Sequence, residues 1–142
     1  MALKILELHH HALRVSPEPG SLDKSLAFYR DVLGLTSDPG RPDFSLGGAW
    51  MDVGRKAQIH LMAIDGTSAV ASDPRLDPTR PHVALAVADI QEAKSELDRH
   101  GVRYLAVSVM GDARMEQLFM LDPGGNVIEL HQIGTCRCNR PD

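Results

Sequence analysis

Hydrophobic and polar residues alternate with a period of two along several short stretches of this chain, and this alternation predicts β-strands. The clearest of these strands cover Leu8 to Val15 and Ala57 to Ile64, and a third strand is predicted from His82 to Val87, with His82, Ala84 and Ala86 on one face. Between the first two, apolar residues from Leu22 to Leu33 recur at mixed steps of three and four, which predicts a helix capped by Ser21. A second helix is expected from Ile90 to about Arg99, where His100-Gly101 ends it.

Turn signals separate the remaining predicted strands, which cover residues 44–46, 49–53, 102–109, 116–121 and 127–133. The last two are joined by the turn sequence Asp122-Pro123-Gly124-Gly125-Asn126. The polar segment from Asp65 to Pro81 contains three prolines and is too long for an ordinary connection. It is expected to be a linker or a lid between two halves of the chain.

The two halves carry an internal duplication. The pattern His-x-Ala-Leu-x-Val occurs at residues 10–15 and again at 82–87, and Ile59-His60-Leu61 corresponds to Ile128-Glu129-Leu130. Each half is therefore predicted to be a β-α-β-β-β module with a potential metal ligand on its first strand and another on its last. A repeat of this kind defines the architecture more firmly than any single propensity.

The predicted architecture is one α+β domain over residues 1–142. Its first βαβββ module covers residues 8–64, the linker 65–81, the second module 82–133 and a tail 134–142. One module alone would expose a sheet face, whereas two paired modules can form a curved mixed sheet around a central cleft, with helices on the outer backs. Equivalent strand faces should then meet at a pseudo-twofold axis, which brings together His10, His60, His82 and Glu129.

Composition narrows the possible functions. The chain has a net charge of −4, 43% hydrophobic residues and only 4% aromatic residues, which argues against a nucleic-acid binder or a membrane-surface protein. No apolar run approaches the ~20 residues needed to cross a bilayer. Cys136 and Cys138 are too close together to staple a fold, so the chain is expected to be cytoplasmic and reduced.

Two stretches of sequence, together with the histidine-bearing strands, resemble the vicinal oxygen chelate superfamily, which includes glyoxalase I, bleomycin resistance proteins, methylmalonyl-CoA epimerase and extradiol dioxygenases. They are Lys24 to Leu35 (KSLAFYRDVLGL) and Phe119 to Leu130 (FMLDPGGNVIEL). The resemblance covers roughly Leu8 to Gln132. It implies paired βαβββ modules and a divalent metal that chelates neighbouring oxygens of a small substrate and stabilises an oxyanion intermediate.

The resemblance also selects ligands. It implies His10 rather than His9 or His11 on the first strand, with His82 and Glu129 at the equivalent positions of the second half. His60 occupies the fourth position, where glyoxalase I enzymes usually have Glu and the epimerases Gln. Three imidazoles and a carboxylate suit zinc, nickel, iron, manganese or cobalt.

The sequence leaves the reaction open. Glu129 and His131 are the candidate proton carriers, and Arg14 and Gln58 are candidate substrate-binding residues. A lyase or isomerase of the glyoxalase type is the first hypothesis. If His60 does not ligate, the other three form the triad of a non-haem iron dioxygenase. A non-catalytic drug-binding protein is a third hypothesis. It predicts the loss of metal ligands, whereas all four ligand positions hold residues that can bind a metal.

Two further expectations concern partners and specificity. A homodimer is expected, because the family often pairs chains. The loops from Asp38 to Gly48 and from Asp65 to Pro81 are expected to determine which small molecule enters the cleft.

Overall fold

The computed structural model describes residues 2–108 and 116–134. The strands, in chain order, are β1 (Ile5–Val15), β2 (Thr36–Ser37), β3 (Gly48–Val53), β4 (Ala57–Ala63), β5 (His82–Val87), β6 (Tyr104–Ser108), β7 (Glu116–Leu121) and β8 (Val127–Gln132). The helices are α1 (Ser21–Ala27), the π-helix η1 (Phe28–Val32), the 3-10 turn η2 (Pro74–Leu76) and α2 (Ile90–Arg99).

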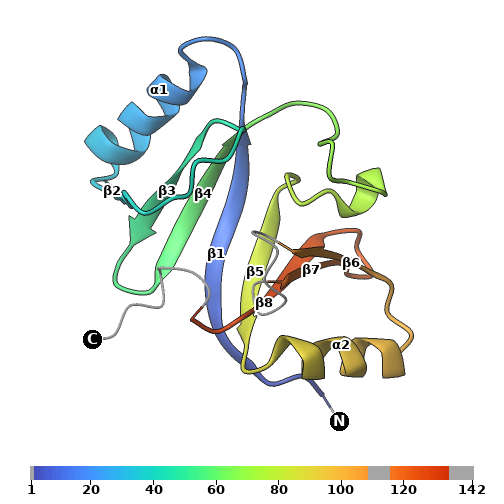
Figure 1. Cartoon of the computed structure of the whole chain (residues 1–142). Helices are drawn as coiled ribbons and strands as arrows, with labels where there is room; N and C mark the ends of the chain where they lie inside the picture. Colours follow the sequence, from blue (N-terminus) through green and yellow to red (C-terminus); the bar gives the residue numbers. More distant parts are fainter. Residues whose placement is uncertain (1, 109–115, 135–142) are drawn as a thin grey trace.

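All eight strands form one mixed sheet with the order β2-β3-β4-β1-β5-β8-β7-β6. β1 and β5 lie antiparallel at its centre, and each pairs in parallel with the last strand of its own half, β4 or β8. Figure 1 shows these two strands side by side in the middle of the molecule, with α1 and α2 toward opposite ends. The predicted α+β fold of paired βαβββ modules is confirmed.

The strand register reproduces the duplication residue by residue. At the centre, His10 pairs with Ala84 and Ala12 pairs with His82, as a twofold axis between the halves requires. On the flanks, Ala12 pairs with His60, and its counterpart Ala84 pairs with Glu129. The two candidate ligands on the outer strands therefore occupy equivalent places.

β1 breaks this symmetry with two register shifts, the first between Ile5 and Glu7 and the second beside the candidate ligands. Between Leu8 and His10 the strand advances two positions while β5 advances one, so His9 is the additional residue of a β-bulge. A bulge disrupts the alternation of side chains and re-aims one of them. As a result, His9 and His10 are both buried and both line the same cavity, although they are neighbours on a strand.

The helices pack on the sheet with unequal cores. Asp89 caps α2 by accepting hydrogen bonds from the backbone N–H groups of Gln91 and Glu92, and α2 buries Ile90, Ala93 and Leu97. α1 and η1 contain no fully buried residue, and they pack through partly buried side chains against Met51 and Leu61. No helix in the described ranges is long and apolar enough to cross a bilayer.

Two local predictions are wrong. Ser21 does not cap the first helix: the N-cap is Gly20, whose φ of 83° is accessible to glycine, and no side chain caps this end. The expected strand 44–46 is absent, and the edge strand of this half is β2. Residues 38–47 form a loop instead, because the Asp38 carboxylate accepts the Gly40 N–H and Arg41 donates to the Leu46 carbonyl.

The segment 65–81 is packed against the sheet over part of its length. Asp77 is 1% exposed and accepts hydrogen bonds from the backbone N–H groups of Ser68 and Thr79. Arg14 on β1 donates from Nε to the Thr79 carbonyl (2.8 Å) and from Nη2 to the Thr79 hydroxyl (2.9 Å). These bonds fix the end of the linker immediately before β5.

The predicted tail, including Cys136 and Cys138, lies outside the described residues apart from Gly134. Val109, the expected end of one strand, lies outside them too, and β6 ends at Ser108.

Candidate metal centre

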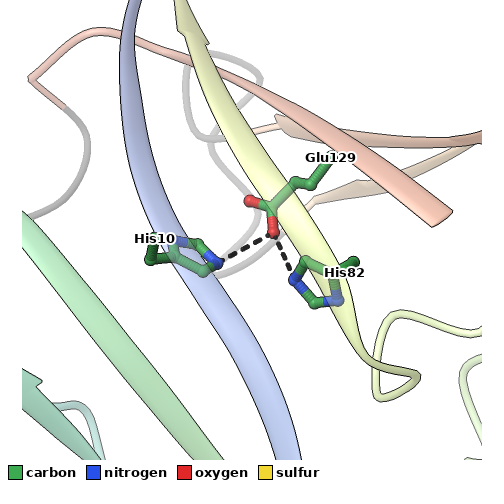
Figure 2. A group of neighbouring side chains, drawn as sticks. All are labelled: His10, His82 and Glu129. Carbon is green, nitrogen blue, oxygen red and sulfur yellow. Dashed lines mark ion pairs between the residues drawn. The ribbon is translucent and has the colours of Figure 1, made fainter. Parts of the chain in front are cut away.

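Side chains from three strands meet at the centre of the sheet. His10 comes from β1, His82 from β5 and Glu129 from β8, and all three are buried. Figure 2 shows both imidazoles directed at the same carboxylate oxygen: Nε2 of His10 lies 3.3 Å and Nε2 of His82 2.9 Å from Oε2 of Glu129. One donor atom from each residue lies within 4.8 Å of the other two, the spacing of a possible metal site.

The tautomer of His82 is determined by the backbone. Nδ1 of His82 lies 2.6 Å from the carbonyl oxygen of Arg80, which can only accept, so Nδ1 carries the proton. In the neutral ring, Nε2 then offers a lone pair and faces the oxygen of Glu129 without a hydrogen-bond partner. Two buried lone-pair atoms facing each other require a proton or a cation between them. A histidine N–H bonded to a carbonyl is also the usual outer support of a metal ligand.

His10 is held in the neutral form that binds metals. Burial lowers the pKa of His10 to about 3, and this effect outweighs the opposing attraction of Glu129. Its Nδ1 lies 2.6 Å from Nδ1 of His9, so one of these two nitrogens carries the shared proton. If His10 keeps Nε2 free as a ligand, its Nδ1 is the donor and His9 accepts.

Glu129 stays ionised in the interior. Burial alone would raise its pKa, but the contacts with His10, His131 and His82 hold the pKa well below the usual value. Gln117 on β7 donates from Nε2 to Oε1 of Glu129 over 2.8 Å, which leaves Oε2 to the two histidines. Gln117 was not predicted from the sequence. The pairing of β7 with β8 across the 122–126 turn is the signal that points to it, because Gln117 pairs with His131.

The turn between these strands sets their register. Both carboxylate oxygens of Asp122 accept hydrogen bonds from Asn126, one from the backbone N–H and one from the side-chain amide. Gly125 has a φ of 83°, which a side chain would disfavour. This turn returns the chain so that Glu129 pairs with Phe119 and faces the centre.

His60 lies beside this group rather than within it. Its ring stacks on that of His10, with centroids 3.7 Å apart and an angle of 18°, and on Trp50 from the other side, at 4.6 Å and 11°. Lone pairs of imidazole lie in the ring plane, so stacked rings direct them along separate, nearly parallel planes. Among the described residues, the group of converging donor atoms comprises His10, His82 and Glu129 only.

Gln58 positions His60 rather than lining the cavity. Its amide nitrogen donates to the carboxylates of Asp38 (3.1 Å) and Asp52 (2.9 Å), so its oxygen faces His60. Nε2 of His60 lies 2.8 Å from that oxygen and must therefore carry a proton. Gln58 is 2% exposed and is not among the described cavity-lining residues.

Of the other predicted residues, His131 lies at the site and Arg14 does not. His131 is buried, lines the cavity and places Nδ1 3.4 Å from Oε1 of Glu129, while neither ring nitrogen has a hydrogen-bond partner. Arg14 is engaged by Thr79 of the linker and is absent from the described lining of the cavity.

The donor group opens on a cavity of about 420 Å³, within the range of small-molecule sites. Apolar side chains from both halves and both loops form much of its wall, notably Phe44, Leu46, Trp50, Val70, Pro78 and Phe119. Residues of both loops therefore line the cavity, and their role in selecting the small molecule stays a prediction. Two imidazoles and one carboxylate, with the Nε2 of His82 lacking a hydrogen-bond partner, fit a divalent transition metal.

Comparisons with known proteins identify the family of this chain. The family model described as Glyoxalase/Bleomycin resistance protein/Dioxygenase superfamily matches residues 8–130. The Arabidopsis thaliana protein named glyoxylase I 4 is 27% identical over 120 residues, which cover 84% of this chain. The match covers 66% of that protein, just under two thirds of its length.

Solved structures with the same fold include enzymes of different reactions. Methylmalonyl-CoA epimerase from Mycobacterium tuberculosis is 27% identical with a TM-score of 0.68, and the match covers 93% of this chain and 91% of the epimerase. The 2,3-dioxygenase LapB from Pseudomonas sp. KL28 is 20% identical with a TM-score of 0.67, and the match covers 100% of this chain but 46% of the dioxygenase.

Proposed function

This chain belongs to the Glyoxalase/Bleomycin resistance protein/Dioxygenase superfamily, and from that membership we propose that it is a metal-dependent lyase or isomerase of the glyoxalase type. Its substrate is a small molecule with two neighbouring oxygens. The observation that carries the proposal is the convergence of two histidine Nε2 atoms on one oxygen of Glu129, where the Nδ1–H tautomer directs the Nε2 lone pair of a neutral His82 at that oxygen.

His10, His82 and Glu129 would hold the metal. When bound, a divalent metal supplies Lewis acidity, which stabilises negative charge developing on substrate oxygens. Gln117 keeps Oε1 of Glu129 occupied and so orients the carboxylate. The apolar wall around the site excludes water and strengthens the electrostatic effect of the nearby charges.

His131 is the proposed proton carrier of this site, together with Glu129. The ring of His131 is buried on the cavity wall, and both of its nitrogens lack a hydrogen-bond partner, so one can accept a proton from a bound substrate. Its Nδ1 lies 3.4 Å from Oε1 of Glu129, which can stabilise the imidazolium that forms. A base of this kind is what isomerisation next to a carbonyl requires.

The first test is elemental analysis of protein purified without a chelator. We expect about one divalent transition metal per chain, and its loss in His10→Ala and in Glu129→Ala. Metal-loaded protein in D₂O should then exchange the α-proton of 2-oxo or 2-hydroxy compounds, followed by NMR, and His131→Gln should slow this exchange while keeping the metal. Full metal occupancy in both ligand variants would overturn the proposed centre.

A second candidate is an iron-dependent dioxygenase. The observation in its favour is that the converging group consists of two histidines and one carboxylate, which is the ligand set of non-haem iron oxygenases. His60 lies beside this group. The test is anaerobic loading with iron(II), followed by oxygen uptake in the presence of catechols. Uptake that depends on iron and on Glu129 would favour this reaction, and α-proton exchange without uptake would favour the first.

A further inference from the structure

One cationic side chain reaches the cavity from the loop that joins β2 and β3. Arg41 is the only Arg or Lys among the described residues that line the cavity. On the same wall lie Phe44 and Leu46 from its own loop and Trp50 from β3. The donor group and Arg41 therefore border one shared cavity of about 420 Å³, which apolar side chains also line.

Arg41 is held in place before any ligand binds. Nη2 donates to the carbonyl of Leu46 over 2.9 Å, and the guanidinium carbon lies 4.9 Å from the centre of the Phe44 ring. Gly48 makes room for this arrangement: a Cβ there would lie 2.9 Å from Nη2 of Arg41. A side chain fixed in this way loses less conformational entropy when it binds a ligand.

The loop that carries Arg41 is anchored to the sheet at its start. Asp38 is buried, and its backbone N–H donates to the Trp50 carbonyl over 2.8 Å. Its carboxylate accepts from the backbone of Gly40 (2.8 Å) and from the amide of Gln58 (3.1 Å). The same Gln58 also binds His60, so the position of Arg41 is tied to the sheet beside the donor group.

Arg41 has donor capacity that the described residues do not use. Its Nε is buried and has no hydrogen-bond partner among them. Burial lowers the pKa of Arg41, and the nearby charge of Asp43 opposes this, but the group stays cationic. A half-buried guanidinium on the wall of a cavity suits a planar anion, and a carboxylate is the small anion that its fork matches best.

We propose that Arg41 binds a carboxylate of the substrate. This carboxylate lies at the opposite end of the substrate from the two neighbouring oxygens that face His10, His82 and Glu129. The substrate class is thus a small carboxylic acid with an apolar middle part, which lies against Phe44, Leu46 and Trp50. This inference rests on the proposed function for the orientation of the substrate, whereas the anion site itself depends only on Arg41 and the loop around it.

The test compares two series of probes on zinc-loaded protein. Monohydroxamates of succinic, glutaric, adipic and suberic acid carry two neighbouring oxygens at one end and a carboxylate at the other, and neutral alkyl hydroxamates of the same length are their controls. Binding is followed through the fluorescence of Trp50, the only tryptophan of the chain, which lines the cavity. At one chain length the acid should bind about 10- to 100-fold more tightly than its neutral counterpart.

Matched variants test whether the preference for the acid over the neutral hydroxamate depends on Arg41. Arg41→Gln should abolish it while leaving the zinc content and the affinity for neutral hydroxamates unchanged. Arg41→Lys, which keeps the charge but not the planar fork, should retain part of it. Arg30→Gln removes an exposed arginine that pairs with Asp31, and it should behave as the unmodified protein. Equal binding of both series by the unmodified protein, or an unchanged preference in Arg41→Gln, would overturn the proposal.

Failure of the metal centre gives a different result. If no hydroxamate binds the zinc-loaded protein better than the metal-free protein, the proposed function fails. Arg41 is then tested alone, by comparing hexanoate with 1-hexanol on the metal-free protein. A preference for hexanoate that disappears in Arg41→Gln supports the anion site, and no preference overturns it.

Discussion

The two halves of the molecule place different chemistry at the same position of the same fold. In the first half, the residue opposite Ala12 is His60, and in the second half the residue opposite Ala84 is Glu129. His60 lies stacked between Trp50 and His10, whereas the carboxylate of Glu129 contacts the rings of His10 and His82. Equivalent backbone positions thus do not ensure equivalent roles.

The neighbouring strand accounts for part of the difference. Trp50 pairs with His60, and Phe119 occupies the corresponding place opposite Glu129. A flat imidazole gains by stacking between two aromatic rings, and Gln58 adds a hydrogen bond in the plane of the ring. A carboxylate has no ring to stack, so Glu129 is held at its oxygens by Gln117 and the histidines.

The helices of the two halves differ in the same direction. α2 buries three apolar residues in a cluster that includes Leu118 and Leu130. The helical segment of the first half leaves Phe28, Val32 and Leu33 at 50%, 69% and 51% exposure. The half that contributes the carboxylate therefore also contains the larger buried core.

The largest expected effect separates the two equivalent positions. Glu129→Gln removes the negative charge from the converging group, so the affinity for zinc should fall by more than about 100-fold. His60→Gln should change it by less than about tenfold, because the His60 donor atoms do not converge with the others. Competition with a chromogenic chelator measures both. Equal losses would restore His60 as the fourth ligand that the family resemblance implies.

The second comparison concerns the cores. Leu97→Ala leaves a cavity under α2, where Leu97 is 6% exposed, and should lower the free energy of unfolding by about 2–5 kcal/mol. Leu26→Ala in α1 removes a partly buried side chain and should cost about 1 kcal/mol. Urea denaturation monitored by circular dichroism measures the two values. A larger loss for Leu26→Ala would contradict the difference between the halves.

The third comparison uses the two buried glutamines. Gln117→Leu removes the donor to Oε1 of Glu129 and should weaken zinc binding by about 10- to 100-fold. Gln58→Leu removes the partner of His60 and should alter the fluorescence of Trp50, which stacks on His60, with little change in zinc affinity. If Gln58→Leu weakens zinc binding as much as Gln117→Leu, the buried glutamines of both halves support the metal site.

The smallest effect is a dependence of stability on pH that arises from His10. Its pKa falls from 6.5 to about 3 in the folded protein, so between these values the unfolded chain binds a proton that the folded chain does not. Above pH 6.5 this proton uptake does not lower the free energy of unfolding. As the pH drops below that value, the free energy of unfolding falls by at most about 1.4 kcal/mol per pH unit. Urea titrations of the metal-free protein at pH 7 and 5.5 should show this loss, and His10→Gln should reduce it.

Several features of the fold could be predicted because they repeat. Alternation of apolar and polar residues marks the first part of β4 and part of β1, and the duplicated His-x-Ala-Leu-x-Val pattern marks β5 and makes His82 the equivalent of His10. The 122–126 turn was recognisable from its glycines and asparagine. Each of these signals is contained in the order of the residues, and none depends on which segments pack together.

Other features have no local signature. A single extra residue in β1 re-aims His9 toward the cavity, yet it leaves the composition of the strand unchanged. The loop 38–47 contains residues that also suit a strand, and its conformation depends on the buried Asp38 and on Gln58, twenty positions away. The guanidinium of Arg14 is occupied by Thr79 of the linker, 65 positions away, and no local pattern indicates that contact.

By itself, the sequence determined the paired modules and the equivalence of four positions on their strands, because periodicity and duplication are properties of the chain alone. Tertiary structure decided which of those side chains share one centre. The direction of an imidazole or a carboxylate depends on what stacks on it and what donates to it, and those partners come from other strands. Trp50 stacks on His60 and Gln58 hydrogen-bonds it, which holds the His60 ring beside the donor group. Gln117 orients Glu129 and the Arg80 carbonyl orients His82, so that these two side chains face each other.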